Sequence, residues 1–351
     1  MLEEIYPRLL SEVIATASPD LHVDQRRALA SCKNGECRNE SYGSLVKAHY
    51  AQHPSSNLGL LLGSYLLPSS LCDFSQALRT APTIGAALDL IPRYYYAQGA
   101  SYYPFISKHE RSVRICMLFP KRKGISEVQR RYCAETALSY LANAFLENIS
   151  TTICPKSLWF DFSKPAYSEQ YKMRFGRTGL FDQAMTVVEF DASALDIPLN
   201  THNPTLHSLY LKKYLEFAHD CERAEGFHHK VIATLLLEHP ESMNSQDLAN
   251  RLNISVRGLQ KRLSKFDLSF SAIANDCRRE LSKVYLLCEN RGTDATAELL
   301  GFQSTSGFRR FFRSEFDMTP CDYIAQQKNL AQRFNPSQDS CANNNIDALS
   351  H

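Results

Sequence analysis

The sequence predicts an α+β domain over residues 1–222, followed by an all-α domain over residues 223–333 that contains two similar pairs of short helices. Its length of 351 residues favours two domains and leaves room for a third. In the first part, segments in which apolar and polar residues alternate occur beside segments whose apolar residues have helical spacing. In the second part, apolar residues occur only at helical spacing. Residues 334–351 have almost no apolar periodicity, and we expect a disordered tail.

The composition is that of a soluble globular protein, with 44% apolar and 22% charged residues and a net charge of +2. The longest apolar run, Leu58–Leu67, is shorter than the ~20 residues that a membrane helix needs, so we expect no membrane span. The 11 cysteines are scattered singly behind a start without a signal peptide, which is typical of reduced thiols in the cytoplasm.

A metal site would need a cluster of ligands at matched spacing. A zinc site is conceivable at Cys32 and Cys37, with His22 and Cys72 as further ligands. The sequence has no second pair of ligands at matched spacing. We therefore expect no metal and no cofactor.

The predicted elements of the first domain begin with helices, because residues 6–17, 44–52 and 83–95 have apolar positions at helical spacing. After them the apolar residues Val113, Ile115 and Met117 alternate with Arg114 and Cys116, the period of a half-buried strand in a short β-hairpin.

An amphipathic helix is predicted over residues 127–148. Strands follow near residues 157–165 and 186–199, separated by a helix that ends at Gly176, a favourable C-cap. One more helix runs from Pro204 to about Cys221, and Gly226 is the expected hinge between the domains.

Residues 244–266 predict a helix-turn-helix unit. Leu248, Ala249 and Leu252 form one apolar face, a turn follows at Asn253, and a second helix continues to Phe266. The caps of the two helices are predicted at Asn244 or Ser245 and at Ser255. With Leu259, Leu263 and Phe266 turned inward, the second helix exposes side chains that can read bases and contact phosphates, namely Arg257, Gln260, Lys261 and Arg262.

The same arrangement recurs over residues 294–316. A short helix ends near Gly301, which supplies a left-handed turn, and a second helix turns four phenylalanines inward at three-and-four spacing. The side chains that this leaves for the groove and the phosphates are Thr305, Ser306, Arg309, Arg310 and Arg313. Between the units, residues 269–287 predict one helix that holds them at a fixed separation, so one protomer could read two consecutive major grooves about 34 to 36 Å apart.

A basic helix over an apolar core is usually only a solvated face. Two units in tandem, each with a small residue or asparagine at the turn and a basic second helix, favour the DNA-binding interpretation over that alternative.

The segments GFQSTSGFRRFFRSEFDMTPCDYI and SVRGLQKRLSKFDLSF resemble the signature of the AraC/XylS transcription regulators. The resemblance covers roughly residues 226–331 and implies double-stranded DNA and RNA polymerase as partners, most often in activation. It also implies base contacts from both second helices. Asp317 departs from the family, which usually has Gly there, and predicts slight strain in that turn.

The first domain resembles that of the ornithine-utilisation regulator subgroup, through NLGLLLGSYLLPSS, the segment APTIGAALDLIPRYYYAQGASYY, and FDASALDIPLNTHNPTL. We expect it to bind a small-molecule effector and to dimerise, and do not expect a cupin barrel. An aromatic cluster with one arginine could line the effector site through Arg93, Tyr95, Tyr96 and Tyr102. The burial habits of aromatic residues favour the alternative that these rings alternate between core and surface.

The sequence is compatible with three classes of function. The leading one is an effector-responsive, homodimeric DNA-binding regulator. The second is a regulator without a small ligand, controlled by a protein partner or by its own abundance. The third is an enzyme, which the sequence does not favour because it has no P-loop, no dinucleotide-binding turn, no paired metal motif and no nucleophile elbow, so we name no catalytic residue.

Overall fold

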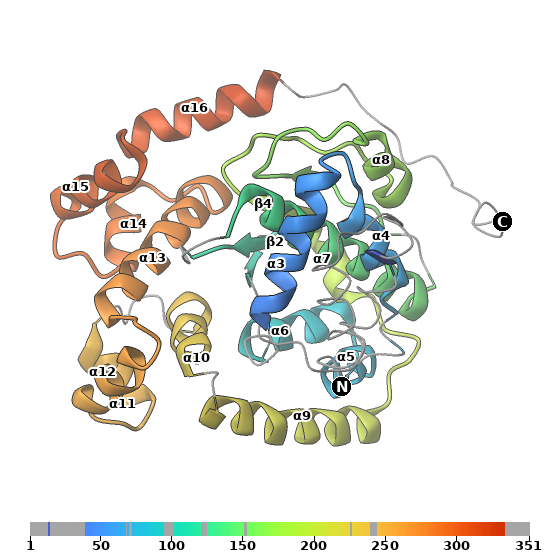
Figure 1. Ribbon diagram of the computed structural model, residues 1–351, viewed down its shortest axis with the longest axis horizontal. Helices are drawn as coiled ribbons and strands as arrows, with labels where there is room; N and C mark the ends of the chain where they lie inside the picture. The colour runs from blue at the N-terminus through green and yellow to red at the C-terminus, as the bar shows by residue number, and fades with distance from the viewer. Residues whose placement is uncertain are drawn as a thin grey trace.

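The chain forms a mixed domain with a helical region along one side of it (Figure 1). The computed structural model describes residues 13–14, 39–67, 69, 72–94, 102–120, 125–150, 153–224, 227–238 and 244–333. Gly226, Cys32, Cys37 and the tail from residue 334 lie outside the described residues, so the hinge and the tail stay predictions. None of the described helices is long and apolar enough to cross a membrane.

The N-terminal domain is built on a four-stranded antiparallel sheet in the order β1-β2-β4-β3. Its strands are β1 (Tyr103–Lys108), β2 (Ser112–Leu118), β3 (Ser157–Trp159) and β4 (Thr186–Asp191). β1 and β2 form the predicted hairpin, with Ile106 opposite Ile115.

Helices surround this sheet. They are α3 (Asn39–Gln52), α4 (Leu58–Tyr65), α5 (Asp73–Arg79), α6 (Ile84–Tyr94), α7 (Glu127–Asn148), α8 (Glu169–Phe175) and α9 (Pro204–Ala224), with a 3₁₀ turn η3 (Ala192–Asp196). The helix predicted over residues 127–148 is confirmed, and a capping box between Ser126 and Gln129 explains its start. Gly176 caps α8 with φ 73°, a left-handed conformation.

α4 and α7 cross closely because α4 has glycines at the contact. A Cβ on Gly59 would lie 2.7 Å from Cβ of Glu135, and one on Gly63 would lie 2.5 Å from the carbonyl oxygen of Thr136. Any larger side chain at these two positions would force the helices apart.

Both faces of β2 are buried, which corrects the half-buried strand predicted from its alternation. Val113, Ile115 and Met117 pack with the helices of the N-terminal domain. Cys116 and Leu118, on the opposite face, pack into the core of the C-terminal helical region. A strand covered by a second domain cannot be recognised from its own alternation, because its polar-looking face is buried by residues far along the chain.

The C-terminal region is entirely helical within residues 227–238 and 244–333. Its elements are α10 (Phe227–Ala233), η4 (Thr234–Glu238), α11 (Ser245–Arg251), α12 (Val256–Ser264), α13 (Phe270–Lys283), η5 (Val284–Cys288), α14 (Thr293–Leu299), α15 (Thr305–Phe316) and α16 (Pro320–Arg333). The connecting helix predicted over residues 269–287 is α13, capped by Ser269 and continued by one turn of π-helix, η5. The two sequence-predicted regions are therefore an α+β domain and a helical domain.

Candidate nucleic-acid interface

The first predicted unit forms two short helices that share an apolar interior. The side chain of Asn244 caps α11 by accepting from the amide of Asp247, and Ser255 caps α12 by accepting from the amide of Gly258 at 3.0 Å. Between the helices Asn253 adopts φ 54°, the left-handed turn. Leu259 and Leu263 are fully buried.

The opposite face of α12 is exposed, as predicted. Arg257, Gln260, Lys261 and Arg262 are all exposed. The guanidinium of Arg262 lies 5.0 Å from the centre of the Phe227 ring in α10, which holds this side chain at the edge of the face. The other three form the exposed, polar surface of a helix whose apolar side is fixed in the core.

The second unit repeats this construction. Gly301 adopts φ 71° in the turn after α14, and Ser304 caps α15 by accepting from the amide of Gly307 at 3.2 Å. Phe308 and Phe312 are fully buried in the α15 core. The helix ends at Asp317 with φ 57°, so this residue takes the left-handed conformation that glycine would adopt without strain.

The outer face of α15 carries the predicted polar residues. Ser306, Arg309, Arg310 and Arg313 are exposed. Thr305 is half-buried, and its hydroxyl donates to Asp294 of α14 at 2.6 Å. This hydrogen bond, which the sequence analysis missed, fixes the start of α15 against the preceding helix.

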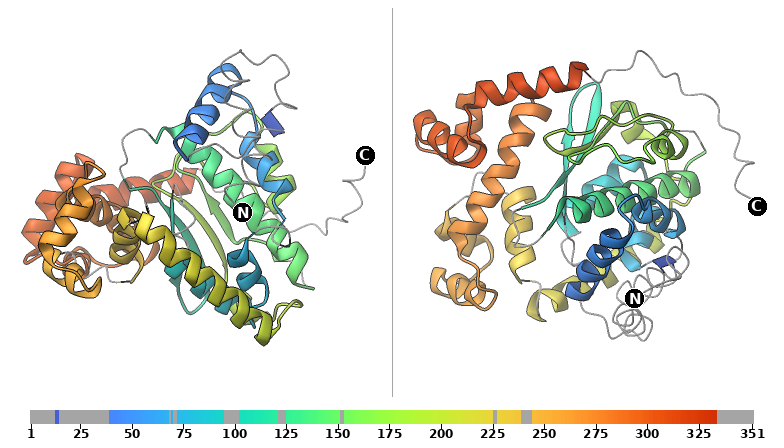
Figure 2. Two further views of the ribbon diagram at one scale, coloured as in Figure 1. Left: turned by 60° about the horizontal axis from the view of Figure 1, so that its bottom comes forward. Right: turned by 45° about the horizontal axis from the view of Figure 1, so that its top comes forward.

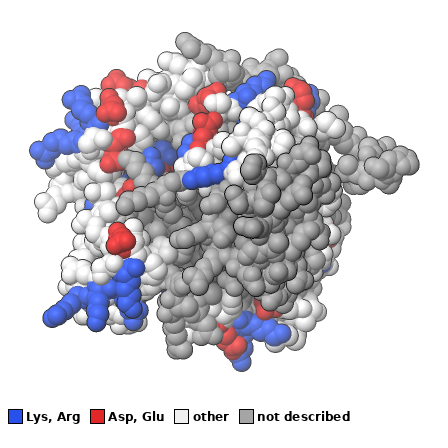
Figure 3. Space-filling model, viewed as in Figure 1, with Lys and Arg blue, Asp and Glu red and all other residues white. Residues whose placement is uncertain are grey.

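The two exposed helices lie along the edge of the molecule away from the N-terminal domain (Figures 1 and 2). Lys and Arg side chains form two patches on this edge, one over α12 and one over α15 (Figure 3). α13 runs between the two units. Its residue Arg278 donates from Nε to the carbonyl oxygen of Leu300 at 3.2 Å and lies 5.1 Å from the centre of the Phe302 ring, so the second unit is fastened to α13.

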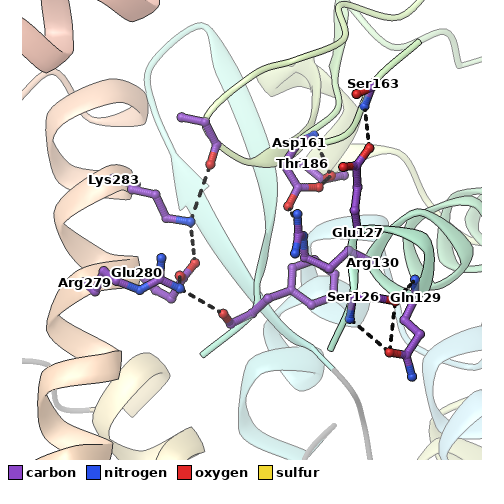
Figure 4. A network of polar contacts seen from close by, with 12 residues as sticks. Ser126, Glu127, Gln129, Arg130, Asp161, Ser163, Thr186, Arg279, Glu280 and Lys283 are labelled. Carbon is purple, nitrogen blue, oxygen red and sulfur yellow. Dashed lines mark hydrogen bonds and ion pairs between the residues drawn. The ribbon is translucent and has the colours of Figure 1, made fainter. Parts of the chain in front are cut away.

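The N-terminal domain contacts the inner side of α13. Glu280, which is 1% exposed, pairs with Lys283 at 2.7 Å and with Arg279 at 2.6 Å (Figure 4). Lys283 and Arg279 reach the carbonyl oxygens of Ala184 and Phe119 in the N-terminal domain. The buried carboxylate therefore orients two cations toward the backbone of the other domain.

Further polar contacts cross the same boundary. The phenolic oxygen of Tyr103 in β1 lies 2.8 Å from Nδ1 of His229 in α10. Ser107 donates to Glu289 at 3.4 Å. These contacts join the sheet of the N-terminal domain to α10 and to the residue that follows η5 in the C-terminal region.

The residues predicted for an effector site are described only in part. Arg93 is exposed in the last turn of α6. Tyr102 is half-buried, with its ring centre 6.0 Å from that of Phe119. Tyr95 and Tyr96 lie outside the described residues. Only two of the four predicted side chains are therefore described, and the effector site stays a prediction. The described part of the chain contains no cluster of three or more metal-ligating His, Cys, Asp or Glu side chains.

Two family models match the chain. Residues 25–199 match the arabinose-binding domain of AraC transcription regulators, N-terminal part, and residues 248–326 match a helix-turn-helix domain. Together with the two exposed helices, these matches define a helix-turn-helix transcription regulator. The chain belongs to the AraC family, and its similarity to an ornithine utilization regulator supports the subgroup that the sequence suggests.

The chain is similar to several individual proteins. The chain is 23% identical to the ornithine utilization regulator of Pseudomonas aeruginosa over 290 residues, which cover 83% of this chain and 85% of that protein. It is 33% identical to the porin thermoregulatory protein EnvY of Escherichia coli K12 over 85 residues, 24% of this chain and 34% of that protein. The crystal structure of the regulator CdpR from Pseudomonas aeruginosa matches with 19% identity and a TM-score of 0.41, over 86% of this chain and 96% of that one.

Proposed function

We propose that the protein binds specific DNA sequences by placing α12 and α15 in two adjacent major-groove segments. The observation that carries this proposal is that both helices bury their apolar face and expose a basic, polar face on the same edge of the molecule. The proposed DNA contacts are Arg257, Gln260, Lys261, Arg262, Thr305, Ser306, Arg309, Arg310 and Arg313.

The residue types suit different parts of the duplex. Arginine can pair with both acceptors of guanine, and glutamine can pair with adenine, so Arg257 and Gln260 are proposed to read bases. Lys261 is proposed to contact either a base or a phosphate. Arg262, held at the edge by Phe227, and Arg313, in the last turn of α15, are proposed to contact phosphates.

Reading of two segments by one protomer requires a fixed separation, and the contacts of Arg278 with Leu300 and Phe302 support it. The test is an insertion of about 5 bp, half a helical turn, between the two protected segments of a footprinted site. A rigid protomer loses affinity for this DNA, whereas the same insertion outside the site has no effect. Equal affinity for both DNAs would contradict the two-segment proposal.

We further propose that a small-molecule effector binds the N-terminal domain and controls the DNA-binding domain. The family match and the size of the domain, which exceeds what dimerisation requires, support this proposal. The test is a thermal-shift titration with sugars and basic amino acids, including arabinose and ornithine, because a ligand of the folded state raises the unfolding temperature. Saturable stabilisation supports effector control, and no shift with any compound favours the alternative of control by a protein partner or by abundance.

The proposed assembly is a homodimer that recruits RNA polymerase and activates transcription in the cytoplasm. The exposed apolar side chains of α9 support a dimer surface on this helix. α9 carries four of the seven large apolar side chains that are exposed within the described residues. These are Leu206, Leu209, Leu215 and Phe217. The matched relatives carry the names of regulatory proteins, two of them transcriptional, and we propose no catalytic activity for this chain.

A further inference from the structure

Two cysteine side chains meet across the boundary between the N-terminal domain and the DNA-binding domain. Cys116 lies in β2, and Cys288 ends η5, which continues the helix between the two DNA-binding units. Their sulfur atoms are 3.7 Å apart, although 172 residues separate them along the chain. Both thiols are free and fully buried.

The surroundings hold both cysteines in place. The guanidinium of Arg114, two residues before Cys116, donates to the backbone carbonyl of Cys288 and pairs with Glu189 at 3.3 Å. The sulfur of Met185 lies 3.5 Å from that of Cys288. Since a disulfide has a sulfur–sulfur distance of about 2.05 Å, closing the pair requires the two sulfur atoms to approach by roughly 1.7 Å.

We propose that Cys116 and Cys288 form a reversible disulfide, which fastens the DNA-binding domain to the sheet of the N-terminal domain when the protein meets a peroxide. The observation that carries this proposal is the contact between the two thiols. The two cysteines are far apart in the sequence, so only the docking of the two domains brings them together.

The burial of the pair determines how the bond forms. Contact with the Cys288 thiol and burial raise the pKa of Cys116 well above its ordinary value, so in the docked arrangement little reactive thiolate is present. Oxidation therefore begins when the domains separate. One thiolate then attacks hydrogen peroxide, its sulfur gains a hydroxyl group to become a sulfenic acid, and hydroxide leaves and is protonated to water.

Renewed docking completes the bond. The second thiol attacks the sulfenic sulfur, the sulfur–sulfur bond forms, and the hydroxyl group leaves with a proton as a second water. Two thiols thus lose two electrons and two protons, and one peroxide becomes two waters. A small dithiol such as dithiothreitol reverses the reaction by thiol–disulfide exchange.

The bond would fix the arrangement in which α12 and α15 are both exposed. On the proposed function, the oxidised protein keeps its DNA-binding surface open but loses any response that needs the domains to move. Formation of the bond itself does not depend on that function.

The first test is a peptide map of the full-length chain. Reduced protein is treated with hydrogen peroxide, its remaining thiols are alkylated, and the digest is analysed by mass spectrometry. We expect a Cys116–Cys288 linked peptide that exceeds every other pair formed by the 11 cysteines and disappears with dithiothreitol. Absence of this peptide, or its formation no more often than other pairs, would overturn the proposal.

The second test measures the urea midpoint of unfolding before and after oxidation. The bond closes a loop of 172 residues and should raise the midpoint. Cys277→Ala is the matched control, because Cys277 is equally buried in α13 but contacts no other described cysteine. The urea midpoint of this variant should still rise on oxidation. Cys116→Ala and Cys288→Ala should abolish the rise of the midpoint. A rise that persists in either variant would contradict a disulfide between Cys116 and Cys288.

The peptide map requires no variant, so it remains decisive if a substitution prevents folding.

Neither of the two tests uses DNA, so their results do not depend on the proposed function. A protein that forms the linked peptide but binds no DNA would refute only the proposed function, and a DNA-binding protein without the peptide would refute only this inference.

Discussion

The carboxyl oxygen Oε1 of Glu135 accepts a hydrogen bond from the hydroxyl of Tyr167 at 2.7 Å inside the N-terminal domain. The hydroxyl of Tyr171 donates to the same oxygen. Glu135 is fully buried where α7 meets α4, and burial raises its pKa to about 7 despite these donors and the nearby charge of Arg131. The domain therefore contains a carboxyl group that titrates near neutral pH.

This group should make stability depend on pH. Because its pKa is raised from 4.5 to about 7 in the folded state, its stabilising contribution is complete below about pH 4.5 and is lost as the pH rises through 7. The full pKa difference between the folded and unfolded states corresponds to roughly 3 kcal/mol in the free energy of unfolding. Urea unfolding at about pH 5 and about pH 8.5 should show lower stability at the higher pH, and Glu135→Gln should flatten this slope. Parallel slopes in both proteins would contradict the assignment.

Gln260 should contribute to base preference. It is exposed on the outer face of α12, where its amide can pair with adenine. Gln260→Ala should lower affinity for the cognate site by about 1–3 kcal/mol and relax the preference at one base position. Gln246→Ala, an exposed glutamine on α11, is the control and should leave binding unchanged. An unaltered ratio of cognate to scrambled affinity in Gln260→Ala would show that this side chain does not read a base.

Arg313 should contribute charge rather than sequence preference. Arg313→Ala should weaken binding to all DNA sequences and reduce the slope of log affinity against log salt by about 0.9, the value for one lost phosphate contact. Lys328→Ala, an exposed cation on α16, serves as the control and should keep the slope. If both variants retain the full slope, Arg313 makes no phosphate contact.

Leu209 should lie in the proposed dimer surface. Its side chain is 45% exposed on α9, and a buried glutamate at an interface between two copies would be costly. Leu209→Glu should therefore shift the protein toward the monomer in sedimentation velocity measurements. Met173→Glu changes a still more exposed apolar residue, on α8, and should not alter the assembly. Dimers that survive Leu209→Glu would place the interface elsewhere.

The local features of the two helix-turn-helix units could be predicted from the sequence because neighbouring residues determine them. The caps at Asn244 and Ser255 satisfy amides within three residues, and the left-handed turns at Asn253 and Gly301 need only those residues. The exposed faces of α12 and α15 follow from the spacing of their buried leucines and phenylalanines.

The contacts between the domains could not be predicted in this way. The alternation of its strand predicts that Cys116 lies on the polar side, but it is buried and contacts Cys288 of η5, 172 positions further along the chain. The hydrogen bond between Tyr103 and His229 likewise joins residues 126 positions apart, so no local pattern predicts it. The hydrogen bond from Thr305 to Asp294 was missed because either residue alone is typical of a helix start.

The measurement that tests the central claim most directly is a mobility shift of the purified full-length protein with DNA from upstream of its own gene, at two salt concentrations and with scrambled competitor DNA. The account predicts a retarded complex that resists the competitor and weakens steeply with salt, because phosphate contacts release counterions. It also predicts that combined alanine substitution of Arg257, Gln260, Arg309 and Arg310 abolishes this specificity. A complex that the scrambled DNA displaces equally well, or one unaffected by those substitutions, would contradict sequence-specific binding through α12 and α15.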